Sequence, residues 1–90
     1  MISFVQETKS YSGIRAGVID QRDSTIGYLF INNGANTMFI NGLTLLVGEF
    51  YSSFSPPFID RTLYRYSFIE NVGEGAVNNY NFLVTEFQAI

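Results

Sequence analysis

Strand-length runs of β-branched and aromatic residues recur along this sequence, separated by Gly, Asn, Ser and Pro. No window of about eleven residues carries the apolar stripe of an amphipathic helix. Runs of this kind are typical of antiparallel β domains. The sequence therefore predicts an all-β fold, an antiparallel β-sandwich or jelly-roll-like barrel of about seven or eight strands without substantial helix.

Residues 37–46 give the clearest local prediction. Asn41-Gly42 separates two short apolar runs, and an Asn-Gly pair in that position favours a type I′ hairpin turn, because both residues must adopt positive φ. The turn fixes the register and places Ile40 opposite Leu43. The face that we expect in the core consists of Met38, Ile40, Leu43 and Leu45.

The other strands are expected at residues 2–8, 14–19, 26–31, 61–69 and 80–87, with a short extended segment at Phe50-Tyr51. The run 26–31 is apolar on both faces, so it is either a central strand or a strand with one face against another chain. Pro56 and Pro57 lack backbone donors. Residues 52–58 are therefore expected to form a stiff loop that carries aromatic side chains.

The chain has 90 residues, which predicts one domain spanning 1–90. Charged residues are only 14% of the sequence, whereas apolar residues are 47%. An average soluble domain carries roughly 25% charged residues, and the shortfall must affect the surface. A surface shared with protein subunits is the simplest explanation.

The residue types that are absent restrict the chemistry. The sequence has no Cys and no His, which removes disulfides, thiolate metal sites and the commonest general base. We expect no enzymatic activity, no metal and no cofactor. The net charge of −3 with scattered basic residues disfavours nucleic-acid binding. Neither a secretion signal nor a membrane span is expected, so synthesis is expected in the cytoplasm.

Two pairs of carboxylates are candidate sites. Asp20 and Asp23 could offer oxygen ligands to calcium, but they lack the remaining residues of a calcium loop, which favours a solvated turn. Glu70 and Glu74 could act as a glycosidase pair, but they flank a glycine turn, and ordinary solvated carboxylates are favoured.

Two arginines form a further candidate site. Arg61 and Arg65 are four residues apart, so on one strand they would share a face and could bind an anion. Ordinary salt bridges or subunit contacts are the favoured interpretation.

The aromatic residues between Phe50 and Phe68 are the most informative set. Some must form the core, but a domain of this size cannot bury all of them, and Tyr is typical of interface cores. The loop from Phe50 to Phe58 is expected to be the main contact with a partner; the alternative is that it folds back as a lid on an open end of the sandwich. The predicted interface comprises Phe50, Tyr51, Phe54, Pro56, Pro57, Phe58, Tyr64 and Tyr66. A glycan-stacking platform of Tyr51, Tyr64 and Tyr66 is the alternative.

Residues 30–49 combine a strand, Asn32-Asn33-Gly34, a second short strand, Asn41-Gly42 and a closing Gly48-Glu49. This skeleton, with the final run 79–84, resembles β-sandwich modules of bacteriophage virion proteins such as small capsid, decoration and fibre-associated proteins. The resemblance implies a structural role in the virion, many copies, extensive protein contacts and no active site. The expected function is assembly, with a ligand- or glycan-binding module as the alternative.

Overall fold

The computed structural model describes residues 4–20, 24–54 and 58–89. They form eight strands, β1 (Phe4–Ser12), β2 (Ala16–Val18), β3 (Thr25–Ile31), β4 (Met38–Ile40), β5 (Leu43–Leu45), β6 (Phe50–Phe54), β7 (Arg65–Phe68) and β8 (Asn81–Ala89). The predicted all-β fold is confirmed. This part of the chain contains no helix long and apolar enough to cross a membrane.

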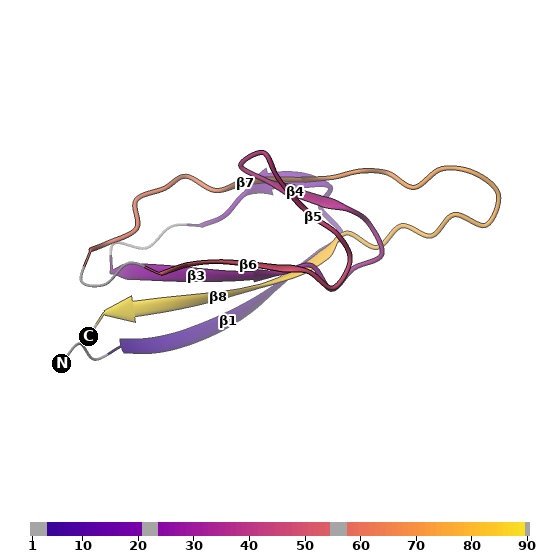
Figure 1. The fold of residues 1–90 in the computed structure, drawn as a ribbon. Helices are drawn as coiled ribbons and strands as arrows, with labels where there is room; N and C mark the ends of the chain where they lie inside the picture. The colour runs from indigo at the N-terminus through magenta and orange to yellow at the C-terminus, as the bar shows by residue number, and fades with distance from the viewer. Residues whose placement is uncertain (1–3, 21–23, 55–57, 90) are drawn as a thin grey trace.

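The strands form two four-stranded antiparallel sheets that lie one above the other (Figure 1). Sheet A has the order β1-β8-β3-β6, and sheet B has the order β2-β7-β4-β5. The first strand pairs with the last, the second with the seventh, the third with the sixth and the fourth with the fifth. This is the pairing of one long antiparallel hairpin, with β4–β5 at its tip, folded over on itself.

The core lies between the sheets and consists mainly of aromatic side chains. Tyr28 and Phe30 of β3 and Phe82 of β8 are fully buried. Tyr64 packs against both Tyr28 and Phe30, with ring centroids 4.9 and 5.0 Å apart. The prediction that residues 26–31 form a central strand is confirmed, because β3 pairs with β8 on one side and β6 on the other.

The Asn41-Gly42 hairpin is confirmed with its register. Asn41 has φ 46° and Gly42 has φ 83°, as a type I′ turn requires. Ile40 lies opposite Leu43. One predicted core residue is wrong: Leu43 is 43% exposed, because β5 is the edge strand of sheet B and Leu43 lies at its turn end.

Several strand boundaries differ from the prediction. β1 continues to Ser12 because it pairs with β8 along its whole length. β6 reaches Phe54, so residues 52–54, predicted as loop, are edge strand. β7 is shorter than predicted and begins at Arg65; before it the chain is irregular, and the carbonyl of Tyr64 accepts a hydrogen bond from Ile19.

The connection between β7 and β8 extends well beyond both sheets, at the end opposite the termini (Figure 1). The principal extents of the molecule are accordingly 53 × 18 × 17 Å. Asparagine side chains fix the base of this loop: Asn36 donates to Asn78 over 2.6 Å, and Asn71 donates to the carbonyl of Ala35 over 3.0 Å. Asn36 itself is buried.

Candidate interface on the outer face of sheet A

Sheet A presents one side to the core and the other side outward. Side chains alternate along each strand, and the buried positions Tyr28, Phe30, Phe82 and Val84 identify the inner side. The strand registers then define the outer face. Its apolar residues are Leu29, Ile31, Phe50, Phe54, Leu83 and Phe87. Its remaining residues are Gln6, Thr8, Ser10, Ser12, Gly27, Ser52, Asn81 and Thr85.

Among the described strand residues, none on the outer face of sheet A is charged. The strands of this sheet carry three charged residues, Glu7, Lys9 and Glu86, and all three occupy inner-side positions. A solvated sheet face ordinarily carries charged and polar residues. On sheet A the charged residues lie at inner-side positions and the outer face is uncharged, which is the pattern expected of a face that is covered.

Two pairs of polar side chains on the outer face are hydrogen-bonded to each other. The hydroxyls of Thr8 and Thr85 lie 2.8 Å apart, and Ser12 donates to the side-chain oxygen of Asn81 over 2.7 Å. Each bond joins β1 to β8 across the face. Because these groups are partnered within the sheet, an apolar partner could cover them at lower desolvation cost.

The apolar residues of the face lie on three adjacent strands, β6, β3 and β8. The ring of Phe54 on β6 contacts that of Phe87 on β8, with centroids 5.3 Å apart. It spans β3 where a Cβ at Gly27 would lie 2.4 Å from Phe54 Cδ2. Glycine at this position therefore leaves the space that the Phe54 ring occupies over β3.

The predicted interface residues are divided between surface and core. Phe50 is 68% exposed, Phe54 is 49% exposed and Phe58 is 72% exposed, so these three are available for contact. Tyr51 is half-buried and packs beside Phe30 at 6.3 Å. Pro56 and Pro57 lie outside the described residues.

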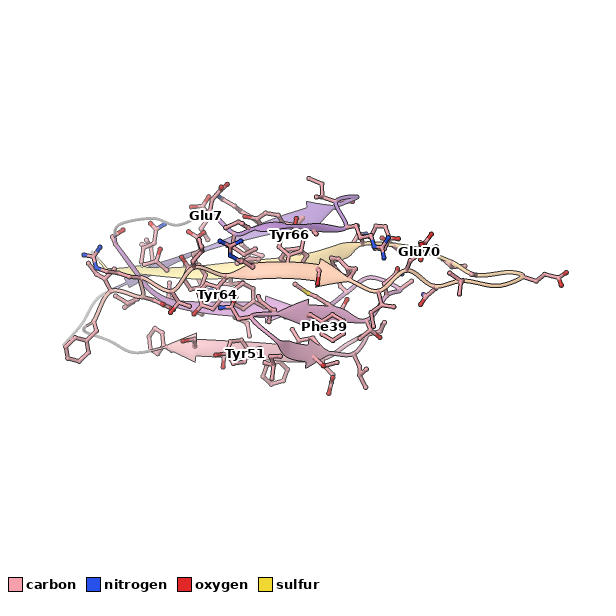
Figure 2. All side chains as sticks on the ribbon, turned by 90° about the horizontal axis from the view of Figure 1, so that it is seen from above. Glu7, Phe39, Tyr51, Tyr64, Tyr66 and Glu70 are labelled. Atoms are coloured by element: carbon pink, nitrogen blue, oxygen red, sulfur yellow. The ribbon has the colours of Figure 1, made fainter. Side chains whose placement is uncertain are left out.

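Tyr64 and Tyr66 are core residues, which corrects the prediction that they contact a partner. They are 3% and 5% exposed. Figure 2, seen from above, shows Tyr51, Tyr64 and Tyr66 one after another across the width of the molecule, but the burial of Tyr64 and Tyr66 leaves no exposed platform of three rings. Tyr64 and Tyr66 share one face with Phe68, as predicted, but that face packs against sheet A. The three-tyrosine glycan platform is therefore wrong.

The arginine pair is also corrected. Arg65 is the first residue of β7, whereas Arg61 precedes the strand, so they share no strand face. Neither forms an ion pair within the described residues. An ion pair joins Arg15 to Glu70, labelled in Figure 2, over 3.7 Å between exposed side chains.

The described carboxylates that are candidates for metal binding or catalysis do not belong to a cluster that could hold a metal ion. Asp20 is exposed, and Asp23 lies outside the described residues. Within the described ranges no three acidic side chains gather as ligands for a metal ion.

A groove of about 240 Å³ opens between the sheets on the β5–β6 side, lined by Ile40, Asn41, Leu43, Tyr51, Ser53, Thr62 and Tyr64. Beside it the Tyr64 hydroxyl donates to Asp60 Oδ2 over 2.5 Å. Burial alone would raise the pKa of Asp60, but hydrogen bonds from Tyr64 and Thr62 outweigh it and lower that pKa. Burial and this hydrogen bond raise the pKa of Tyr64 to about 12.

Sequence reasoning did not assign Leu29, Ile31, Leu83 and Phe87 to an interface. The available signal was the absence of alternation: β3 is apolar at both its inner and outer positions, and Leu83 interrupts the alternation of β8 between Phe82 and Val84. Strand order was needed to place these four residues on one face.

No protein-family model matches the chain, and neither the curated proteins nor the solved structures contain a significant match to it.

Proposed function

We propose that this protein is a non-enzymatic structural subunit that docks through the outer face of sheet A onto a neighbouring protein in a larger particle. The observation that carries the proposal is the absence of charge from that face, in a chain whose three sheet A charges all occupy inner-side positions. Isolated surface apolar residues need no explanation, but a contiguous uncharged face does.

The size of the face suits a modest interface. At about 32 Å² of sheet per outward residue, the face covers on the order of 450 Å². Specific interfaces need roughly 500 Å² or more from each partner. The protruding rings of Phe50 and Phe54 add to the flat area of the sheet, so the face approaches this requirement.

The strand order supports the kind of particle proposed. We infer that the two sheets form a jelly roll, in which the pairs β1–β8, β2–β7, β3–β6 and β4–β5 arise from one rolled hairpin. Jelly rolls occur in viral capsid proteins and in lectins. With the resemblance of residues 30–49 to bacteriophage virion modules, this supports a minor capsid, decoration or fibre-associated component located in the virion.

The docking surface is tested with charge substitutions at its centre. Thr85→Lys and Leu29→Glu place a charge on the outer face of sheet A, whereas Thr44→Lys places one on exposed β5 of sheet B. Each variant is checked for folding by its circular dichroism spectrum and melting temperature. We expect folded Thr85→Lys and Leu29→Glu to be missing from purified particles and Thr44→Lys to be retained. Equal retention of all three would contradict the proposal.

The groove supports a second candidate function, a module that binds a small polar ligand or glycan. Its lining includes the hydroxyl-bearing residues Tyr51, Ser53 and Thr62, whose hydroxyl groups are suited to hydrogen bonding with sugar hydroxyls. Its volume is below the roughly 300–1,000 Å³ of typical ligand sites, so we rank this second. A glycan array tests it, with Ser53→Ala as the matched loss-of-binding variant; a blank array removes it.

A further inference from the structure

Among the edge strands that the structure describes, β6 is the one that is neither very short nor charged. Native sheets protect their edges with charged residues, or make them very short. β2 and β5, the edges of sheet B, are three residues long. β1, one edge of sheet A, carries Glu7 and Lys9. β6, the other edge, has five residues and no charge.

The sequence of β6 is complementary to itself in the antiparallel direction. It reads Phe50-Tyr51-Ser52-Ser53-Phe54. If two copies pair about a two-fold axis at Ser52, Phe50 of each copy lies opposite Phe54 of the other. Tyr51 then lies opposite Ser53. Both aromatic pairs fall on the outer face, where the rings are exposed, and no like charges meet although each chain carries −3.

We propose that β6 pairs with β6 of a second copy, so that two copies of sheet A join into one eight-stranded antiparallel sheet. The occupant is a second copy because a two-fold interface must be self-complementary, and β6 meets that condition in its aromatic positions and its lack of charge. The second copy's Phe50 and Phe54 would complete an aromatic row across the join.

This pairing deepens the proposed function and rests on it. It would place two outer faces side by side on one continuous uncharged surface, doubling the area available for docking onto a particle. The building unit would then be a dimer whose sheet A faces point in the same direction.

Single cysteines test the pairing directly, because the chain has none of its own. At Ser52 the two Cα atoms would lie about 4.5–5.5 Å apart, within the range that a disulfide spans. Ser10→Cys is the matched control, since Ser10 is also an exposed serine on the outer face but belongs to β1. Thr85→Cys reports the rival arrangement, in which two outer faces stack on each other.

Under mild oxidation at micromolar protein, we expect Ser52→Cys to form a disulfide-linked dimer on the order of a hundredfold faster than Ser10→Cys, because pairing raises the local thiol concentration. Equal rates would overturn the proposal. Faster linkage of Thr85→Cys than of Ser52→Cys would also overturn it, in favour of stacked faces, while leaving docking through the outer face intact.

Charge exchange at Ser52 gives an independent test without cysteine. Like charges directly opposite each other destabilise a strand pair, whereas opposite charges stabilise it. We expect Ser52→Lys and Ser52→Glu each to be monomeric by light scattering and their equimolar mixture to be dimeric. A mixture that stays monomeric, or single variants that remain dimeric, would contradict β6 pairing. Particle retention of Thr85→Lys tests the docking proposal separately.

Discussion

Asp60 and Tyr64 form a buried acid–phenol pair whose effect on stability depends on pH at both extremes. The folded pKa of Tyr64 is raised to about 12, whereas the phenol of the unfolded chain ionises near pH 10. The contribution of Tyr64 to the free energy of unfolding is therefore complete below about pH 10 and is lost as the pH rises towards 12. The folded pKa of Asp60 is lowered, so its contribution is complete above about pH 4 and is lost as the pH falls through the folded value.

We therefore predict that Tyr64→Phe flattens the alkaline limb of the stability profile. Between pH 5 and pH 9 the free energy of unfolding of the wild type should exceed that of the variant by about 1.5–3 kcal/mol, because the variant lacks a buried charge-assisted hydrogen bond. From pH 10 to pH 12 this difference in the free energy of unfolding should decrease by on the order of 2 kcal/mol. Urea denaturation at each pH measures this. Identical alkaline limbs would contradict the assignment, and Asp60→Asn should alter the acid limb and, because Asp60 helps to raise the Tyr64 pKa, the alkaline limb as well.

Gly34 is required for a close approach between backbone segments. A Cβ at this position would lie 2.1 Å from the carbonyl oxygen of Asn79 and 2.9 Å from the amide nitrogen of Asn81. Backbone atoms cannot swing aside as a side chain can. We predict that Gly34→Ala lowers the free energy of unfolding by about 1–3 kcal/mol, whereas Asn33→Ala, at the exposed neighbouring residue, changes it little. Equal denaturation midpoints would refute the contact.

Gly42 is required for a different reason. Its φ is +83°, and a Cβ there would meet no atom within 4 Å. We predict that Gly42→Val costs about 1–2 kcal/mol through backbone conformation alone, and that Gly42→Asn costs less, because Asn tolerates positive φ. Chemical denaturation checks both variants. A Gly42→Val midpoint at the wild-type value would show that this turn does not limit stability.

Among the elements, β6 and the nearby Phe58 are where we expect substitutions to affect assembly and leave stability nearly unchanged. Phe54 and Phe58 are half-exposed and largely exposed, so replacing both rings should remove little from the core. We predict that the double variant Phe54→Ser, Phe58→Ser melts close to the wild type but is lost from the particle. If the isolated variant unfolds or melts far lower, the two rings belong to the core and the segment is a lid.

The elements differ in how far the sequence alone could predict them. The Asn41-Gly42 hairpin was predicted with its register because its turn is chemically specified by two adjacent residues. The burial of Leu43 was mispredicted because exposure at that position depends on β5 being an edge strand, which is a property of the whole sheet.

The assignment of Tyr64 and Tyr66 failed for a related reason. Alternation correctly placed both side chains on one face with Phe68, but nothing local states whether that face meets sheet A or another chain. Only the order of the strands, which results from contacts distant in sequence, makes this face the core. The same contacts bring Leu29 and Phe87 together on the outer face.

At the scale of the whole molecule, the low content of charged residues can be related to one face of the domain. The sequence has 14% charged residues, and none of them lies at the described positions of the outer face of sheet A. The other distinctive feature, the β7–β8 loop, projects from the opposite end to the termini (Figure 1). The protein thus has one flat uncharged side and one projecting end, a shape suited to a component of an assembly.

The most direct measurement is the recovery of the chain in purified particles, compared between the wild type, Thr85→Lys and the matched control Thr44→Lys. Docking through the outer face of sheet A predicts that the wild type and Thr44→Lys sediment with the particle and that folded Thr85→Lys remains in the soluble fraction. A wild-type chain that stays a monodisperse monomer at high concentration and never associates with a larger particle would contradict the account.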